Sequence, residues 1–205
     1  MRKLLRERQI DWLFHFTRAE NLFNIFRYGL IPIEILKRRG ISVVNNDHIR
    51  YDNCDNAICT TIEFPNYKMF YSLRLDNPGV KWAVLRLRAD IICDFECAFC
   101  TENAGSATMF TMSIEKRQGK EAFLKMFEEL PNGPTRNELG LGDWYTTNPQ
   151  AEVLVFGEVP IEYIDCVYFE TRADLNEYED IIPEEIEAAV NRELFFGRKD
   201  WKKWQ

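Results

Sequence analysis

The fold is most readily predicted from one stretch, Gln150-Ala151-Glu152-Val153-Leu154-Val155-Phe156, in which a single carboxylate precedes an unbroken apolar run. Breakers flank this stretch, with Asn148-Pro149 before it and Gly157 after it. β-Branched and aromatic residues that run together between breakers predict a buried β-strand. A glutamate at the start of such a strand must be solvated, paired or used in chemistry, because an isolated buried carboxylate is costly. Taken alone, the stretch favours a solvent-facing glutamate at the strand edge.

Length and composition limit the possible number of domains and the class of protein. With 205 residues, 46% hydrophobic and 14% aromatic, the sequence fits one domain with a substantial core. No apolar run approaches the roughly 20 residues that a membrane helix needs, so we expect no membrane partner. The start, Met1–Arg8, lacks the apolar segment of a signal peptide, and six cysteines are too few to suggest a disulfide scaffold. We therefore expect a cytoplasmic protein with free thiols.

The net charge of −7 argues at first against a nucleic-acid partner. Seven carboxylates lie between positions 174 and 187, however, without any Lys or Arg among them, so the remainder of the chain is formally neutral. Basic clusters occur in that remainder at Arg2–Arg8, Lys37–Arg39 and Arg198–Lys203. The sequence thus leaves open a local basic groove, although clusters of this size are more often solvated surface.

The first part of the chain predicts a strand followed by a helix. Trp12–Thr17 is a mixed apolar and aromatic run that carries His15, and apolar residues recur at helical spacing in Asn21–Tyr28. Gly29 stands where a helix C-terminal glycine belongs. A lone histidine in an apolar strand is usually a core residue, but the chain has only two histidines.

The same patterns extend along the chain and predict one α+β domain over residues 1–205, without internal repeats or a linker. The expected strands are Ala57–Phe64, Val80–Leu87 and Cys166–Glu170. The expected helices are Asn66–Tyr71, Glu121–Glu129 and Pro183–Leu194. Two regions, 33–56 and Leu130–Pro149, are expected to be irregular, and long loops of this kind commonly position a substrate.

Several kinds of functional site are disfavoured by the sequence. Cys97-x-x-Cys100 is half of a zinc pattern, but no second Cys or His pair follows at ligand spacing, so we expect no metal. There is no Walker or dinucleotide phosphate loop and no Gly-x-Ser-x-Gly elbow. What remains is a strand histidine, a loop arginine, a Met- and aromatic-rich segment and a strand glutamate. Such a set suits a reaction in which a glycosidic bond breaks, because a carboxylate beside the sugar stabilises the developing positive charge.

An ordered set of short motifs across positions 15–152 resembles the DarT family of DNA ADP-ribosyltransferase toxins. These motifs are His15-x-Thr17 with Asn21 and Gly29, Arg50 ahead of Ala57–Phe64, Pro65–Tyr71, Asn103-Ala104 and Gln150-Ala151-Glu152. The resemblance implies a single-domain ADP-ribosyltransferase-like fold with a central split β-sheet and flanking helices. It also implies cleavage of NAD, used as a co-substrate, at the nicotinamide ribosyl bond and transfer of ADP-ribose to a base in single-stranded DNA. A macrodomain-containing antitoxin is the implied partner.

The resemblance also implies roles for particular residues. Glu152 matches the catalytic glutamate, and Arg50 matches an essential loop arginine that serves both catalysis and NAD binding. His15 matches the histidine that contacts the nicotinamide side of NAD. Less central members of the NAD site are Thr17, Asn21, Met69 and Tyr71. The loop Leu130–Pro149 corresponds to the loop that recognises the acceptor.

Two questions about the activity stay open at this point. The Asn66–Phe70 segment resembles the guanine-modifying branch more than the thymine-modifying one, so guanine is favoured as the acceptor base. The same chemistry could instead act on RNA or protein, and a non-catalytic nucleotide-binding or partner-binding module is a further alternative. A binding relic would not need the glutamate, which disfavours that last alternative.

Overall fold

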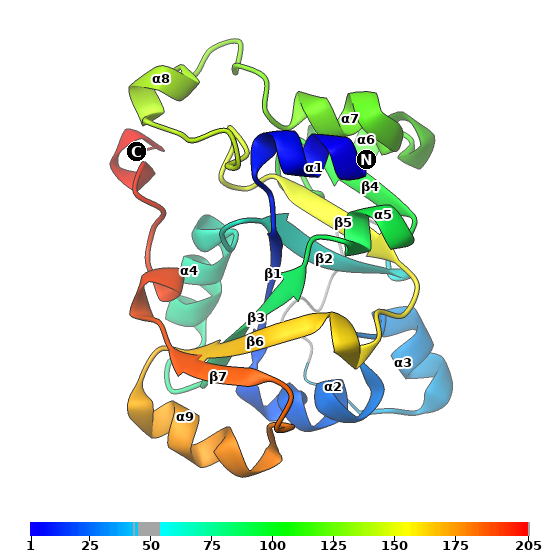
Figure 1. The fold of residues 1–205 in the computed structure, drawn as a ribbon, viewed down its shortest axis with the longest axis vertical. Coiled ribbons are helices and arrows are strands. Elements are labelled where there is room, and N and C mark those ends of the chain that lie inside the picture. Colours follow the sequence, from blue (N-terminus) through cyan, green and yellow to red (C-terminus); the bar gives the residue numbers. More distant parts are fainter. Residues whose placement is uncertain (43, 45–53, 205) are drawn as a thin grey trace.

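A seven-stranded mixed sheet forms the centre of the computed structural model, which describes residues 1–42, 44 and 54–204 (Figure 1). The strands are β1 Trp12–Arg18, β2 Ala57–Ile62, β3 Trp82–Arg88, β4 Cys97–Cys100, β5 Glu152–Phe156, β6 Ile164–Phe169 and β7 Glu187–Val190. Their order in the sheet is β4-β5-β2-β1-β3-β6-β7. All neighbouring pairs are antiparallel except β6 and β7, which run parallel.

The sheet is split between β1 and β2. These strands share two residue pairs, Leu13 with Ile62 and Phe14 with Thr61, whereas β1 and β3 pair along seven residues. Beyond Phe14, β1 keeps its partner on the β3 side, and β2 keeps its partner on the β5 side. The two halves therefore meet at one end of this seam and separate at the other. The expected α+β fold, with a split central sheet and flanking helices, is confirmed.

Helices surround both ends of the sheet (Figure 1). They are α1 Arg2–Arg8, α2 Leu22–Tyr28, α3 Ile33–Arg39, α4 Tyr67–Asp76, α5 Ile91–Asp94, α6 Ala107–Thr111, α7 Gly119–Lys125, α8 Arg136–Leu139 and α9 Arg172–Tyr178, with short 3-10 turns that include η5 Arg192–Phe195 and η6 Trp201–Trp204. The helices α1 and α5–α7 lie near β4 and β5, whereas α2, α3 and α9 lie at the opposite end. None of the helices in the described residues has the length and apolar character needed to cross a bilayer.

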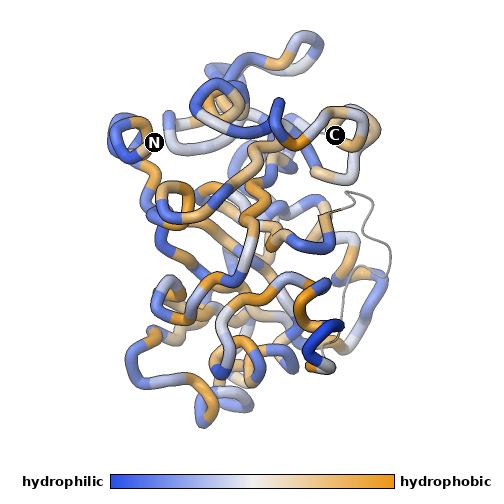
Figure 2. Tube along the Cα trace, turned by 90° about the vertical axis from the view of Figure 1, so that its right-hand side faces the viewer, coloured by the Kyte–Doolittle hydropathy of each residue, from blue (hydrophilic) through white to orange (hydrophobic). Residues whose placement is uncertain are grey.

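Strand alternation divides the core into two principal clusters. On β3, Leu85 and Leu87 face the larger cluster, while Val84 packs with an aromatic group that includes Phe70 and Trp82. The period of two follows because successive side chains of a strand point to opposite faces. In Figure 2 the hydrophobic segments cross the interior and the hydrophilic ones lie mainly at the outer turns. The sheet is thus held from both faces, which makes it a rigid base for the groups at its split.

The turn after α2 brings a loop against the β5–β6 connection. Gly29 ends α2 with a φ of 82°, and a Cβ at this position would stand 2.4 Å from the Val159 carbonyl oxygen. Leu30 and Val159 exchange two backbone hydrogen bonds of 2.9 Å each. Only glycine fits this left-handed conformation and close approach, so the predicted helix C-terminal glycine is confirmed.

Some elements differ from the sequence-based expectation. The stretch Pro183–Leu194 is not a helix, since it holds strand β7 and then begins the 3-10 turn η5. Pairing with the exposed edge of β6 satisfies backbone groups there, and this tertiary contact outweighs the helix propensity of Glu and Ala. The two regions expected to be irregular contain α3 and α8, and Cys97–Cys100 forms the edge strand β4.

Candidate active site

A cavity of about 460 Å³ opens where β1 and β2 separate. Its walls come from the splayed strands, from the end of α2 and the Gly29–Ile33 turn, from α4, and from the loop after β4. Glu152 is among the residues that line this cavity, and the cavity volume is within the range of about 300–1,000 Å³ typical of small-molecule and cofactor sites. The split of the sheet is therefore what creates room for a ligand.

Glu152 is a buried and paired carboxylate. It is the first residue of β5, lies opposite Cys100 of β4 and is 5% exposed. Its Oε2 accepts a hydrogen bond from the Ala104 backbone N–H at 2.8 Å. Its Oε1 accepts from Asn66 Nδ2 at 3.0 Å and from Asn103 Nδ2 at 3.4 Å. The solvent-facing strand-edge interpretation is thus wrong, because N–H donors replace the water that a buried carboxylate would lose.

The two asparagines are themselves fixed. Asn66 is the N-cap of α4, where its Oδ1 accepts from Met69 N at 3.2 Å. Asn103 Oδ1 accepts from Gly105 N at 2.9 Å. Turning either amide over would lose its backbone bond, so both present their NH2 groups to the carboxylate. The Glu152 carboxylate is consequently held by two separate chain segments, the start of α4 and the Asn103-Ala104 loop.

His15 bridges the split of the sheet. Its ring lies on β1, and its Nδ1 stands 2.8 Å from the Cys59 carbonyl oxygen on β2. Since a carbonyl oxygen can only accept, Nδ1 carries the proton, and Nε2 carries the lone pair in the neutral ring. The histidine lines the cavity together with Glu152.

Asn21 connects the cavity wall to Val44. Its Nδ2 donates to Thr17 Oγ1 at 3.1 Å and to the Val44 carbonyl oxygen at 3.0 Å, and its Oδ1 accepts from Val44 N at 3.0 Å. Both amide hydrogens of Asn21 are therefore used within the protein. The contribution of Asn21 to the cavity is to hold Thr17 and Val44 in place.

The remaining predicted residues separate into different places. Met69 lines the cavity, and its Sδ lies 3.7 Å from Asn103 Nδ2. Tyr71 lies elsewhere: it is 58% exposed and borders a second cavity with Arg74 and Phe195. Residues i and i+2 of an α-helix point about 200° apart around its axis, so Met69 and Tyr71 cannot share one face of α4. Arg50 lies outside the described residues.

Sequence reasoning assigned no role to the groups that bind Glu152. Asn66 and Asn103-Ala104 belonged to the quoted motifs, but their donors became visible only in the fold. An asparagine directly before a helix is a recognisable N-cap signal, and it could have flagged Asn66. The backbone N–H of Ala104 and the carbonyl of Cys59 leave no trace in residue types.

The model of the family described as "DarT: ssDNA thymidine ADP-ribosyltransferase, DarT" matches residues 14–201. The chain belongs to the DarT family. A search of curated proteins gave no match.

Solved DarT structures share the fold at low sequence identity. Thermosipho africanus DarTG in complex with ADP-ribose is 15% identical with a TM-score of 0.67, covering 90% of this chain and 51% of that one. The chain thus spans about half the length of that DarTG chain. Thermus sp. 2.9 DarT in complex with NAD+ is 13% identical with a TM-score of 0.59, covering 90% and 97% of the two chains. The same DarT in complex with ADP-ribosylated ssDNA is 13% identical with a TM-score of 0.59, covering 92% of this chain and 97% of that one.

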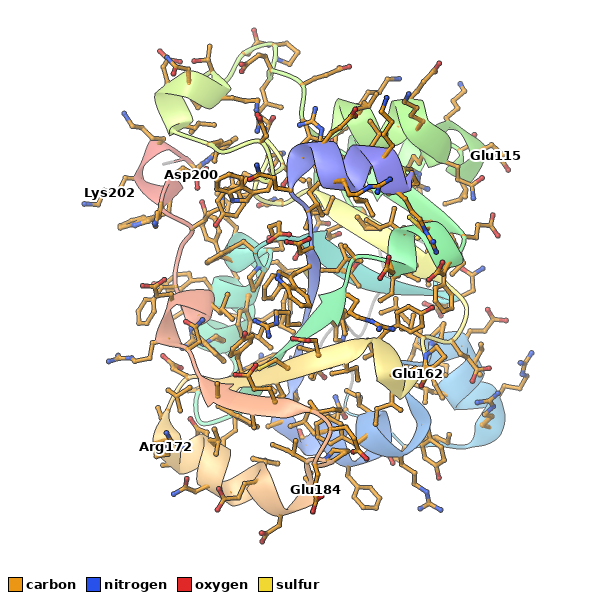
Figure 3. All side chains as sticks on the ribbon, viewed as in Figure 1. Glu115, Glu162, Arg172, Glu184, Asp200 and Lys202 are labelled. Atoms are coloured by element: carbon orange, nitrogen blue, oxygen red, sulfur yellow. The ribbon has the colours of Figure 1, made fainter. Side chains whose placement is uncertain are left out.

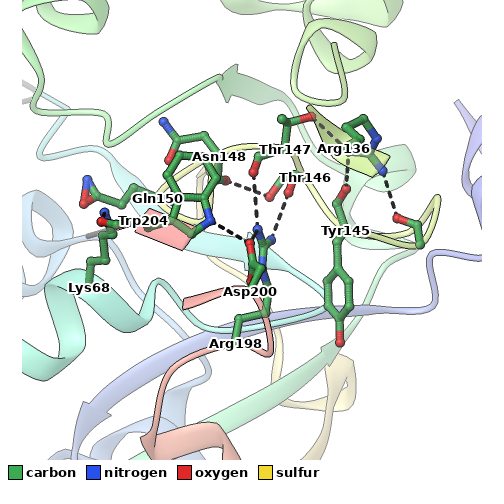
Figure 4. Close-up of polar contacts among 11 residues, drawn as sticks. Lys68, Arg136, Tyr145, Thr146, Thr147, Asn148, Gln150, Arg198, Asp200 and Trp204 are labelled. Carbon is green, nitrogen blue, oxygen red and sulfur yellow. Dashed lines mark hydrogen bonds and ion pairs between the residues drawn. The ribbon is translucent and has the colours of Figure 1, made fainter. Parts of the chain in front are cut away.

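In this member of the DarT family, arginines hold the loop that leads to Glu152 (Figure 4). Arg136 donates to the carbonyl oxygens of Gly142 and Tyr145 at 2.8 Å each and to Thr147 Oγ1 at 2.9 Å. Arg198 donates to the carbonyl oxygens of Thr146 at 2.9 Å and Thr147 at 3.3 Å. Because all of these contacts except the one to Thr147 Oγ1 go to backbone oxygens, they fix the course of the loop largely independently of its side chains.

Arg198 itself forms a buried pair with Asp200 (Figure 4). The contact is bidentate, with Nε–Oδ1 and Nη2–Oδ2 distances of 2.7 and 2.6 Å, and Trp204 Nε1 donates to Oδ2 at 2.7 Å. Burial alone would raise the pKa of Asp200, but the hydrogen bond and charge of Arg198 outweigh it and lower that pKa. Burial also raises the pKa of the nearby Tyr67 to about 12, with a smaller contribution from Asp200. The C-terminal segment is thereby tied to the loop before Glu152.

Proposed function

We propose that the protein is an NAD-dependent ADP-ribosyltransferase that attaches ADP-ribose to a base in single-stranded DNA. The observation that carries the proposal is the Glu152 carboxylate, buried at the split of the sheet and fixed by three N–H donors beside the cavity. Membership of the DarT family supports the same activity. The NAD+ and ADP-ribosylated ssDNA complexes of the Thermus sp. 2.9 DarT support the same co-substrate and acceptor for this chain.

The cavity fits an NAD co-substrate by its size and by its polar groups. NAD supplies an ADP-ribosyl group, and positive charge develops on its ribose as the bond to nicotinamide breaks. Glu152 would hold a ribose hydroxyl and face this charge, so its interaction is stronger in the transition state than in the ground state. Its fixed position means that little reorganisation is needed at the moment of reaction.

The other site residues would bind and orient NAD. His15 and Met69 line the cavity and would contact the nicotinamide side, while Thr17 and Asn21 form a polar wall. Arg50 would hold the pyrophosphate by bidentate contacts, as a guanidinium does best. Tyr71 lies outside this cavity and is not part of the proposed NAD site.

We propose guanine as the acceptor base, with thymine as the alternative named in the family description. The support for guanine is the likeness of Asn66–Phe70 to the guanine-modifying branch. We also propose that the protein is the toxin of a toxin–antitoxin pair whose partner carries a macrodomain, which would remove the ADP-ribose. The DarTG name of the Thermosipho africanus structure supports a paired system.

Incubation with NAD and a set of oligonucleotides tests the proposal. The set contains single-stranded DNAs that each lack one base, the matching RNAs and a protein acceptor mixture, and mass spectrometry reads the gain of ADP-ribose. We expect a gain on every DNA except the one without guanine. Loss of the gain only on the DNA without thymine would replace guanine by thymine, and gain on RNA or protein alone would contradict the DNA acceptor.

A further inference from the structure

We propose that the C-terminal turn and the start of α4 form a surface that binds single-stranded DNA next to the acceptor base. We call this surface the basic-aromatic strip, and its members are Lys68, Lys199, Trp201, Lys202 and Trp204. The inference rests on the proposed function, because it supplies the binding surface for the same substrate. It concerns the nucleotides that flank the reactive one, which the cavity itself is too small to hold.

The strip combines the two kinds of side chain that single-stranded nucleic acids need. Trp201 is 42% exposed, and the Lys202 ammonium lies 5.7 Å from its ring centroid. Lys68 Nζ lies 5.4 Å from the Trp204 ring centroid and donates to the Trp204 carbonyl oxygen at 3.1 Å. Proteins that bind single strands place lysines or arginines along the phosphates and aromatic rings against the bases. The two lysines between two tryptophans of η6 match that chemistry.

The strip is held rigidly although it lies at the surface. Trp204 is bonded through its indole N–H to the buried Asp200, which is paired with Arg198. Arg198 in turn donates to the backbone of Thr146 and Thr147. A surface that is already ordered loses less conformational entropy when it binds a ligand. Packing of the C-terminal turn alone would not require the exposed Trp201 ring or the exposed lysines.

The strip adjoins the candidate active site through two connections. On α4, Lys68 contacts Trp204 (Figure 4). Its neighbour Met69 lines the cavity, and Asn66, the N-cap of α4, donates to Glu152. On the other side, the Thr146–Thr147 backbone that Arg198 holds leads directly to β5. A DNA strand whose base enters the cavity would therefore continue over the C-terminal turn.

Charge supports DNA as the occupant of the strip. Asp200 is buried against Arg198 and presents no charge outward, so the strip is positive. Lys203 is left out of the strip because it lies near Glu138, whose pKa is lowered mainly by hydrogen bonds from Thr135 and secondarily by Lys203. The acidic segment 174–187 lies at the other end of the molecule, where Figure 3 shows Glu184 far from Lys202. Phosphates are thus attracted to one end and repelled from the other.

Binding of two fluorescent oligonucleotides tests the strip separately from catalysis. Both carry the same acceptor base, and one has long flanks while the other has only one neighbour on each side; anisotropy gives the Kd of each. Trp201→Ala is expected to raise the Kd of the long oligonucleotide by between about 5-fold and about 150-fold, which is the range for the loss of stacking on one base. The weakening should be smaller for the short oligonucleotide.

The lysines are tested by the salt dependence of the same Kd. In Lys199→Ala/Lys202→Ala the slope of log K against log salt should fall by about 1.4, since each phosphate contact to a single strand contributes about 0.7. The matched control Lys120→Ala/Lys125→Ala removes two exposed lysines of α7 and should leave the slope unchanged.

Equal Kd values of the wild-type protein for the two oligonucleotides would overturn the proposal that the basic-aromatic strip binds DNA. Variants that keep the wild-type Kd and the wild-type salt dependence would overturn it as well. An effect of the variants on a protein partner, with DNA binding intact, would assign the surface to that partner instead. Transfer of ADP-ribose is measured in parallel, and its absence in the wild type would count against the proposed function alone, because anisotropy still decides the strip.

Discussion

Replacing Glu152 by glutamine keeps the size of the side chain and removes its charge. The backbone N–H of Ala104 cannot turn away, so the new amide must direct its oxygen there. Its NH2 then faces the amide nitrogens of Asn66 and Asn103, whose own oxygens are committed to backbone donors. Leaving such buried donors unpaired costs about 1–3 kcal/mol, which is the loss of folding stability that we expect for Glu152→Gln.

The catalytic loss follows from the charge. Two unit charges about 4 Å apart attract by roughly 4 kcal/mol at an effective dielectric constant of about 20. If Glu152 faces the positive charge on the ribose only in the transition state, its neutralisation raises the barrier by about that amount. Each 1.36 kcal/mol changes the rate about tenfold, so we expect kcat to fall by about 10³-fold.

Single-turnover transfer from NAD to an oligonucleotide measures the rate, and titration calorimetry measures NAD binding. The Kd for NAD should change by less than about tenfold, because in the ground state the positive charge of NAD+ lies on the nicotinamide ring and not on the ribose that Glu152 faces. Glu158→Gln is the matched control: Glu158 pairs with Arg39 at the surface, and its loss should leave rate and binding unchanged. Thermal unfolding shows whether each variant is folded.

A folded Glu152→Gln variant that keeps kcat within about tenfold of the wild type would refute the reasoning, since a charge-dependent step cannot lose so little. A loss confined to NAD affinity would refute it as well, and it would make Glu152 a ground-state binding residue.

Other predictions concern the NAD site and the segments that hold it. Arg50→Ala should lower kcat/KM for NAD by about 10- to 100-fold through loss of a bidentate contact, and unchanged steady-state kinetics would remove Arg50 from the site. Arg198→Lys should lower the free energy of unfolding by about 1–3 kcal/mol, measured with denaturant, because an ammonium cannot reproduce the bidentate pair; an unaltered midpoint would contradict this. The pKa of Asp200 is lowered in the folded protein, so its ionised form stabilises the fold at pH values above the unfolded pKa of about 3.9. This contribution is lost as the pH falls through the lowered pKa, and Asp200→Asn should therefore make the free energy of unfolding less dependent on pH in the acid range. Gly29→Ala should destabilise by about 1–3 kcal/mol through its positive φ and contact with Val159, and a wild-type melting curve would count against the close approach.

Strong local patterns made much of the fold predictable. The apolar run after Glu152 predicted strand β5, the aromatic run around His15 predicted strand β1, and Gly29 marked the end of α2 correctly. The strand β7 was missed because Ile186–Val190 has no decisive pattern of its own and becomes a strand only beside β6. Edge strands of this kind depend on their neighbours more than on their residues.

The reactive group of the candidate site was predictable from the sequence, but the groups that hold it by hydrogen bonds were not. Glu152 and His15 stood out because such residues are unusual within apolar strands. The backbone N–H of Ala104 was not predictable, since any residue type carries one. Tyr71 was placed with the NAD site by the family resemblance, but it lies on another face of α4 than Met69 and borders the second cavity.

The most direct test of the account is a crystal structure of the protein with a non-cleavable NAD analogue. The account predicts the analogue within the split between β1 and β2, with its nicotinamide ribose hydroxyl about 3 Å from an oxygen of Glu152. An analogue bound elsewhere, or a Glu152 carboxylate bonded only to its present donors while the ribose lies out of reach, would contradict the account.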